Sequence, residues 1–374
     1  MDNLTRTLKE LAPKASTVGD KTALVGLDGF IDRIMEVVGK RHGPGEQFDP
    51  LPTIDQWGAR VSAAAGESAN FELWLKYEKL GGNGPNMANA LLAASVQTRY
   101  LGMLGKPVHP LFADFAKRCD AISLGDPGVT HAIEFGDGKI MLGEMADYGS
   151  LTYERIIDSV GEGAFHDILA RSDLISLINW TMTPHLTSIF NDLLSKVLPN
   201  LPPKDGGRIF FFDLCDPAKR SDSDLRSALE AIKRFQAHGR AVLGVNLAEA
   251  LQVGAVLGKE LDGSSTAGIK AAAGWIRDQL EIANVVIHRR DAAACATKED
   301  TYFVNGPFIE KPLISTGAGD HFNAGFCLGL LLDLSPEACL TVAVATSGQY
   351  VRTAESPSIS KTESFLERWQ KGDI

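Results

Sequence analysis

The chain has 374 residues, of which 44% are hydrophobic and 22% charged, and its formal net charge is −10. These are ordinary values for a globular protein, so a substantial core is expected and disorder is not. The acidic balance argues against nucleic acid or an anionic membrane as a partner, because both are bound by clustered Lys and Arg. A nucleotide ligand stays open, since it needs only a small local site.

The cysteines and the N-terminal segment indicate where the protein works. The five cysteines form no CxxC pair, so neither a disulfide framework nor a structural zinc site is expected. The N-terminal segment lacks the apolar centre of a signal peptide and instead predicts an amphipathic helix, with Leu4, Leu8 and Leu11 on one face. No stretch approaches the roughly 20 apolar residues of a membrane span. We therefore expect a cytoplasmic protein.

Short apolar runs alternate with helical patterns along most of the chain. The runs are nearly continuous, which is typical of strands buried on both faces of a sheet. The alternation predicts a mostly parallel sheet covered by helices on both sides, with ligands beyond the carboxyl ends of the strands. Strands are predicted over 22–32, 99–104, 173–179, 208–213, 241–246 and 284–289, and a hairpin over 294–305. Helices are predicted over 85–95, 110–120, 185–197, 222–237, 247–257, 266–280, 318–333 and 336–352.

Two segments interrupt this alternation. Residues 40–80 form a polar insertion punctuated by Gly and Pro, and residues 129–146 predict two strands joined by the turn Gly136-Asp137-Gly138. A small β flap beside an open sheet would suit a lid over an active site. Both segments could equally be surface elaborations. The simplest organisation is one domain, residues 1–374, with lid elements about 36–80 and 129–146.

The strongest chemical signal lies in residues 314–326, ISTGAGDHFNAGF. Glycines just before a helix let the backbone approach a ligand, and the exposed amides and helix dipole favour an anion there. An aspartate in such a turn repels phosphate, so Asp320 makes chemical sense as a base that takes a proton from an attacking hydroxyl. The alternative is a Gly-rich loop in which Asp320 caps the helix. The turn consists of Thr316, Gly317, Ala318, Gly319 and Asp320.

A second motif is Gly81-Gly82-Asn83-Gly84-Pro85-Asn86. The paired glycines permit an unusual backbone path, and Pro85 suits the first turn of the helix that follows. Asn83 or Asn86 could cap that helix. In the functional interpretation, Asn86 and the backbone of Gly82 bind substrate hydroxyls.

A third motif is Asn246-Leu-Ala-Glu249, directly after an apolar strand. Taken alone it predicts a capping box, in which Asn246 caps the helix and Glu249 occupies its third position. The functional interpretation is that the pair orders water around Mg²⁺ and the donor phosphates.

A fourth motif is Asp28-Gly-Phe-Ile-Asp32 at the end of the first predicted strand. An acidic residue at the carboxyl end of a strand can accept hydrogen bonds from two sugar hydroxyls. The alternative is a solvated turn aspartate.

Taken in chain order, these motifs resemble those of the ribokinase family, also called the PfkB carbohydrate kinases. The order is an acidic strand end at 28–32, GGxxxN at 81–86, NxxE at 246–249 and GAGD at 317–320. The joint match spans residues 22 to about 352 and is far more specific than any single motif. It favours the functional interpretation of each motif over capping alone.

The resemblance implies a fold, a reaction and cofactors. The fold is a three-layer α/β/α domain with a mostly parallel central sheet and a small β lid. The reaction is in-line transfer of the γ-phosphoryl group of ATP to a hydroxyl. The implied cofactors are ATP and Mg²⁺, and a monovalent-cation site is left open.

The resemblance also implies roles for individual residues. Asp320 matches the base, and Gly317, Ala318 and Gly319 match the anion hole. Asn246, Glu249 and Thr316 match the element that binds the nucleotide, with Glu249 reaching Mg²⁺ through water. Asp32, Asn86 and Gly82 match the sugar-binding residues, and Asp28 is a further member of that set.

Three segments depart from the family pattern. Ile314-Ser315 replaces the usual Asp-Thr before the glycine turn, and residues 288–293, HRRDAA, replace a Thr or Lys followed by glycines. The second segment normally lies beside the nucleotide, so the choice of donor is open. Asp213 and Asp216 stand where the family often has Asp-x-Asn-x-Arg facing the phosphates.

We therefore expect a kinase acting on a sugar, sugar acid or related polyol, with a small-molecule substrate and neither nucleic acid nor membrane as partner. A nucleoside kinase and an ADP-dependent sugar kinase of the same fold are alternatives. A catalytically weak sugar-binding regulator is a third, although the intact Asp320 argues against it. The sequence specifies neither the sugar nor the oligomeric state, and homodimers formed through the lid are common in the family.

Overall fold

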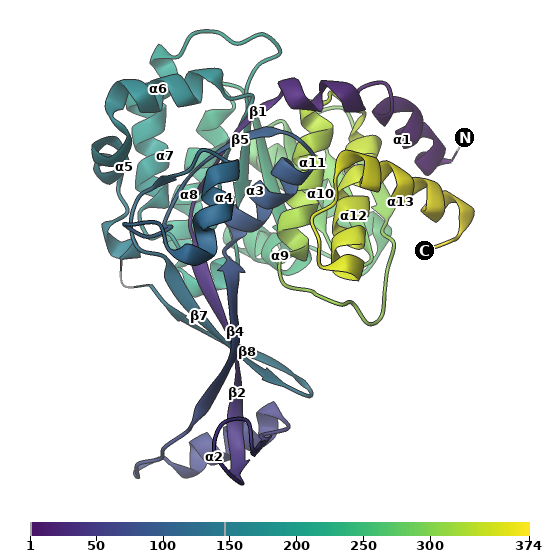
Figure 1. The fold of residues 1–374 in the computed structure, drawn as a ribbon. Coiled ribbons are helices and arrows are strands. Elements are labelled where there is room, and N and C mark those ends of the chain that lie inside the picture. The colour runs from purple at the N-terminus through teal and green to yellow at the C-terminus, as the bar shows by residue number, and fades with distance from the viewer. Residues whose placement is uncertain (1, 146) are drawn as a thin grey trace.

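The computed structural model describes residues 2–145 and 147–374. A large body carries most of the helices and both ends of the chain, and a slender lid projects from it (Figure 1). The body is a sheet between two layers of helices, as the alternation of apolar strands and helical patterns predicts.

The central sheet of the body has nine strands. They are β1 (Thr22–Leu27), β5 (Gln97–Gly102), β6 (Ile122–Ser123), β9 (Leu174–Leu177), β10 (Ile209–Asp213), β11 (Arg240–Asn246), β12 (Asn284–His288), β13 (Ala292–Ala296) and β14 (Thr301–Asn305). Their order is β14-β13-β12-β11-β10-β9-β1-β5-β6. Only the pairs β12–β13 and β13–β14 are antiparallel, at one edge. The carboxyl ends of the parallel strands therefore meet at one side of the sheet.

Helices cover the two faces of this sheet and bury its alternating side chains. On β10, Phe210 and Phe212 join one hydrophobic cluster and Phe211 joins the other, because successive side chains of a strand point to opposite faces. One face is covered by α1 (Asn3–Leu11), α3 (Asn83–Ala93), α4 (Ala113–Arg118), α11 (Ala318–Leu331), α12 (Pro336–Thr353) and α13 (Ile359–Lys371). The other is covered by α5 (Tyr153–Val160), α6 (Glu162–Arg171), α7 (Leu186–Asp192), α8 (Asp222–Phe235), α9 (Leu247–Val256) and α10 (Thr266–Leu280).

The lid is a second, smaller sheet with one helix. Its elements are β2 (Phe30–Arg41), β3 (Phe48–Pro50), β4 (Leu73–Gly81), β7 (Gly128–Phe135), β8 (Gly138–Glu144) and α2 (Ile54–Ala63). β2 pairs with β4 on one side and with β7 on the other, and β7 continues into β8 as an antiparallel hairpin. The insertion and the hairpin, predicted as lid elements, both contribute strands to this sheet and so form one unit.

The 40–80 insertion packs against the hairpin of the lid. Val37, Leu51 and Ile133 form a small buried cluster of their own. Trp57 and Phe135 pack against it, with their ring centroids 5.7 Å apart. The cluster is separate from the two clusters of the body. The lid therefore has its own core.

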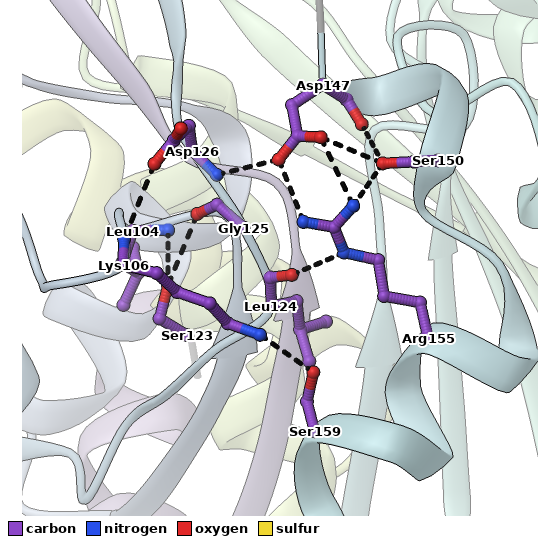
Figure 2. Close-up of polar contacts among 10 residues, drawn as sticks. All are labelled: Leu104, Lys106, Ser123, Leu124, Gly125, Asp126, Asp147, Ser150, Arg155 and Ser159. Atoms are coloured by element: carbon purple, nitrogen blue, oxygen red, sulfur yellow. Dashed lines mark hydrogen bonds and ion pairs between the residues drawn. The ribbon is translucent and has the colours of Figure 1, made fainter.

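A polar network ties the lid to the body (Figure 2). Arg155 in α5 donates to both carboxylate oxygens of Asp147, at 3.1 and 2.9 Å, and to the carbonyl oxygen of Leu124. Asp147 also accepts the backbone N–H of Asp126, so both ends of the β7–β8 hairpin meet at one ion pair. Beside it, the buried hydroxyl of Tyr148 accepts from the N–H of Gly29 and donates to its carbonyl oxygen, each at 2.8 Å.

Several predicted boundaries differ from the structure. The single strand predicted over 22–32 is wrong, because β1 ends at Leu27 and β2 starts at Phe30. The chain turns at Asp28, and a Cβ on Gly29 would lie 2.1 Å from the carbonyl oxygen of Met103, so only glycine fits there. The lid accordingly begins earlier than residue 36.

Other differences concern helices and the ends of the predicted lid. The helix predicted over 185–197 ends in a π-helical turn from residue 193. Helices α5, α6 and α13 were not predicted. Ala146, the last residue of the predicted lid, lies outside the described residues, as does Met1. Within the described chain, no helix combines the length and apolar character needed to span a membrane.

Candidate active site

The predicted site residues gather beside the carboxyl ends of the strands, where α3, α9 and α11 begin. Gly317 precedes α11 with a φ of 88°, in the left-handed region that favours glycine. α3 and α11 contact each other extensively, so their N-termini converge. The N-terminus of α11 exposes unpaired N–H groups, which make this region favourable for an anion, whereas the Asn83 and Gly84 amides that open α3 are bound by the Asp28 carboxylate.

Asp320 lies between the starts of α3 and α11. Asn83 and Asn86 each donate a side-chain N–H to one of its carboxylate oxygens, both at 2.9 Å. Its exposed fraction is 6%, and burial raises its pKa to about 7, although both asparagine bonds favour the ionised form. A carboxyl group with a pKa near neutrality is suited to take up and release a proton.

The glycine turn is held through its carbonyl oxygens. His321 bonds the carbonyl oxygen of Gly317 at 2.7 Å, and the hydroxyl of Tyr350 donates to that of Thr316 at 3.0 Å. The His321 and Tyr350 rings stack at 3.5 Å. The two carbonyl oxygens are thus bound by His321 and Tyr350. The N–H groups at the start of the helix can therefore bind a ligand.

The N–H groups of the turn differ in their availability. The amide of Ala318 already donates to the carbonyl oxygen of Ser315, at 3.2 Å. Across residues 2–145 and 147–374, no protein acceptor takes the backbone N–H of Gly317, Gly319 or Asp320. An anion at this turn would therefore meet those three amides rather than the predicted set of Gly317, Ala318 and Gly319.

A cavity of about 630 Å³ lies between the lid and the turn, on the side of Asp32. Asp32 is 6% exposed and faces Lys79 across the strand pair β2–β4. Burial raises its pKa, opposed by the charges of Lys79 and Lys139. Lys139 in the lid also donates to the hydroxyl of Thr316. The cavity offers carboxylate and ammonium groups to a polar ligand.

Asp28 has a different position from Asp32. Its carboxylate is completely buried and accepts the N–H groups of Asn83 and Gly84, at 2.9 and 2.8 Å, and the amide of Asn179 at 2.7 Å. All these donors belong to the protein, and two of them open α3. The geometry therefore does not support the predicted contact of Asp28 with a sugar, because both oxygens hold the start of the helix.

Gly82 connects the lid to α3 with a φ of 103°. A Cβ there would lie 3.1 Å from the Asp28 carboxylate and 3.3 Å from the N–H of Phe30. Both the conformation and the crowding explain why glycine occupies this position. Asn86, four residues further, faces Asp320 with its amide.

A second cavity, of about 760 Å³, lies on the other side of the turn. It is lined by the start of α9, by residues 288–290 and 306–309, and by α11 and α12. Arg289 is paired with Asp291, and Arg290 lies over the ring of Phe308. Its size and its apolar walls suit a nucleotide base and ribose. The departure from the family pattern at 288–293 therefore falls on a wall of this cavity.

Asn246 and Glu249 form the predicted capping box at the start of α9. The Asn246 side chain accepts the N–H of Glu249, and Glu249 accepts the N–H groups of Asn246 and Asp216, both at 2.8 Å. Glu249 is 7% exposed, and burial raises its pKa. The capping and functional interpretations are compatible, because this helix start lines the second cavity.

The acidic residues around the turn bear on how a metal would be held. Asp213 is buried near Glu249 and Asp320, and burial together with their charges raises its pKa; Asn323 donates to it at 2.7 Å. In the part of the chain that the structure describes, no group of three or more His, Cys, Asp or Glu side chains could hold a metal ion. This donor set fits a cation carried by phosphates, which Glu249 would reach through water.

Sequence reasoning missed several residues that shape the site. Asn83 was considered only as a cap, although its position beside Gly82 in the second motif was a usable signal. Lys139 and Tyr350 come from the lid and from α12, and no local pattern connects them with Asp320. Their involvement depends on tertiary contacts.

The fold and the site define a sugar kinase of the ribokinase-like class. Among solved structures, a carbohydrate kinase from Agrobacterium tumefaciens superposes with a TM-score of 0.63 at 17% identity, covering 93% of this chain and 97% of that one. The ribokinase of Arabidopsis thaliana, complexed with ribose and ATP, gives a TM-score of 0.62 at 17% identity, covering 93% and 98%. These likenesses establish the fold, and the predicted family resemblance is confirmed.

The family is narrower than this class. The family model of prokaryotic ketohexokinase matches residues 2–369, and the chain belongs to that family. It is also 29% identical to the ketohexokinase of Haloferax volcanii over 344 residues, which are 91% of this chain and 90% of the relative. The protein is therefore a carbohydrate kinase that phosphorylates a sugar hydroxyl, as predicted, rather than a nucleoside kinase or a binding regulator.

Proposed function

We propose that the protein transfers the γ-phosphoryl group of ATP to a hydroxyl of a ketohexose such as fructose. The observation that carries the proposal is Asp320, a buried carboxylate with a pKa raised to about 7, at the start of a helix with three unengaged N–H groups. The ketohexose as acceptor rests on the membership in the prokaryotic ketohexokinase family.

In this mechanism the sugar occupies the cavity beside Asp32 and the nucleotide the cavity beside α9. When bound, Mg-ATP supplies the electrophilic phosphorus and a good leaving group. Asp320 takes the proton of the sugar hydroxyl. At the same time the hydroxyl oxygen bonds to the γ-phosphorus, and the bond between that phosphorus and the ADP oxygen breaks. The amides of Gly317, Gly319 and Asp320 stabilise the negative charge on the moving phosphoryl oxygens.

The remaining predicted residues support this arrangement. We propose that Asp32 binds sugar hydroxyls and that Asn83 and Asn86 orient Asp320. Asn86 is close enough to the sugar cavity to contact the sugar as well. Asn246 and Glu249 lie at the end of the second cavity and would hold Mg²⁺ through water. Asp28 is a positioning residue, since its carboxylate fixes the start of α3.

The experiment is ADP release from Mg-ATP with four ketohexoses, set against glucose, ribose, a 2-keto sugar acid and adenosine. We expect turnover with at least one ketohexose, and a loss of about a hundredfold or more in kcat for Asp320→Asn. The control is Asp158→Asn, which changes an exposed carboxylate in α5. Turnover only with other acceptors would overturn the ketohexose assignment, and full activity of Asp320→Asn would overturn the base.

A homodimer formed through the lid and a cytoplasmic location are further parts of the proposal. On the face of the lid that borders the first cavity, Tyr77 and Met141 are exposed apolar side chains, at 52% and 45% exposure. Such a cluster on one flap favours contact with a second copy. Light scattering should give twice the monomer mass, and a monomer at all concentrations would contradict the dimer.

A further inference from the structure

The active site gathers several acidic side chains around the glycine turn. Asp28 and Asp32 act electrostatically on Asp320, and Asp320 and Glu249 act in turn on Asp213. A phosphoryl group in transfer adds negative charge on its outer oxygens, and kinases stabilise that charge with cations. A positively charged side chain facing the turn from the acceptor side would answer this need.

Lys139 is a cation in that position. It is the second residue of β8, and its ammonium group donates to the hydroxyl of Thr316, next to the glycine turn. Its charge also acts on Asp32. Both Asp32 and Thr316 line the same cavity as Lys139. The ammonium group therefore stands between the acceptor site and the start of α11.

Lys139 differs from Lys76, another lysine of the lid sheet. Lys76 pairs with Glu36 at 3.3 Å and with Glu134 at 3.5 Å, and Lys79 faces Asp32 across the strands. Within the described residues, no carboxylate lies within ion-pair distance of Lys139. Its charge is thus free for a ligand, whereas that of Lys76 is already compensated.

The insertion holds the hairpin that carries Lys139. The carboxylate of Asp137, two residues earlier, accepts the N–H of Ile54 at the start of α2, at 3.0 Å. The Ile54 side chain reaches within 3.1 Å of where a Cβ of Gly138 would lie. Together with the packing of Trp57 against Phe135, these contacts fix the tip of an otherwise exposed hairpin. A precise position matters for a charge that acts over a short distance.

We propose that Lys139 is a catalytic residue of the phosphoryl transfer, whose ammonium group binds the moving phosphoryl oxygens. Residues 48–63, a part of the 40–80 insertion, serve to hold Lys139 in that position. Lys139 exchanges Thr316 for a phosphoryl oxygen and keeps its proton throughout, so it adds no bond change to the reaction. The proposal rests on the proposed kinase function. It gives the insertion a role in catalysis.

The test compares Lys139→Met, Lys139→Arg and the matched lid control Lys76→Met by steady-state kinetics. We expect Lys139→Met to lower kcat about a hundredfold, the usual loss for one charge-stabilising donor, with the KM of the sugar changed less than threefold. Lys139→Arg should retain a tenth or more of kcat, and Lys76→Met should behave as the wild type. Wild-type kcat in Lys139→Met would overturn the proposal.

A binding measurement separates this role from a structural one. Mg-ADP with aluminium fluoride and the sugar imitates the phosphoryl group in transfer, and calorimetry gives its affinity. Lys139→Met should weaken this complex at least tenfold while binding Mg-ADP alone as the wild type does, because only the first contains the phosphoryl mimic. Equal weakening of both would overturn the proposal.

The role of the insertion is tested by Asp137→Ala. This change removes the acceptor of the Ile54 N–H but does not alter the Lys139 side chain itself. We expect a smaller fall in kcat, about tenfold, because the ammonium group is then poorly positioned. An unchanged kcat would overturn the role of the insertion. Absence of turnover by the wild type on every sugar would overturn the proposed function itself, whereas wild-type turnover with an unaffected Lys139→Met refutes the Lys139 proposal alone.

Discussion

Asn86 and Asp320 lie 234 residues apart in the chain, yet the amide of Asn86 donates to the carboxylate of Asp320 at 2.9 Å. The bond joins the start of α3, directly behind the lid, to the start of α11, where the phosphoryl group is expected. Together with the matching bond from Asn83, it fixes the site of the acceptor and that of the anion to each other.

Removing this bond should change the acidity of the base. Asn86→Ala removes a hydrogen bond that favours the ionised carboxylate, so the pKa of Asp320 should rise further. The acidic limb of the pH profile of kcat/KM should shift to higher pH, by several tenths of a unit or more. Asn89→Ala, a change in the same helix away from Asp320, is the control. An unshifted limb would refute the role of Asn86.

The wild-type pH profile follows from the same group. Burial raises the pKa of Asp320 from 3.8 to about 7, and the base works only when ionised. We expect kcat/KM to fall as pH drops below 7 and to level off above it, in contrast to the limb near 4 of an ordinary carboxylate. Because the folded protein holds this proton more tightly than the unfolded chain does, Asp320 contributes to the free energy of unfolding. That contribution is complete below pH 3.8 and is lost as the pH rises through 7. Kinetics between pH 5 and 9 test the limb.

Asp28 should matter for stability more than for chemistry. Asp28→Asn places an N–H₂ group against the N–H groups that open α3, so at least one buried donor loses its acceptor. We expect a loss of about 1–3 kcal/mol in the free energy of unfolding. Denaturation in urea measures it, with Asp20→Asn, at an exposed position, as the control. A stability equal to the wild type would contradict the positioning role.

The junction of lid and body makes a further prediction. Tyr148→Phe removes the hydroxyl that accepts the N–H of Gly29, and this buried N–H has no other acceptor among the described residues. The cost should again be about 1–3 kcal/mol. Tyr77→Phe alters a lid tyrosine that is 52% exposed, and should cost little. If thermal melting gave equal losses for both variants, the Tyr148 bond would not be what stabilises the junction.

The sequence predicted the parts of the fold that depend on local pattern. The apolar strands of the central sheet and the helix after Gly317 are confirmed, because their patterns have a clear period. The break at Asp28 was missed, since the apolar run continues through it and only the contact of Gly29 with Met103 reveals the turn. The helices over 153–171 were missed as well, although Thr152 caps the first of them.

The site divides in the same way. The motifs around Asp320 and Asn86 contain the residues that meet in the structure, because glycine turns and helix starts leave a local signature. Lys139 had no such signature, since its place in the site depends on a contact between a lid strand and Thr316, just before α11. Asp28 is a residue type that could bind a sugar hydroxyl, but its carboxylate is buried and accepts hydrogen bonds from the protein instead.

The lid has a consequence for how this protein can be rebuilt. The chain enters it after β1, returns at α3, enters again at β7 and leaves after β8, so the lid consists of two excursions separated by α3, β5, α4 and β6. It cannot be cut out or exchanged as one contiguous cassette. A chimera that borrows the lid of a relative must replace both excursions together, because β2 and β7 are hydrogen-bonded partners from different ones. Substrate preference in such chimeras should therefore be inherited from the two segments jointly, never from either alone.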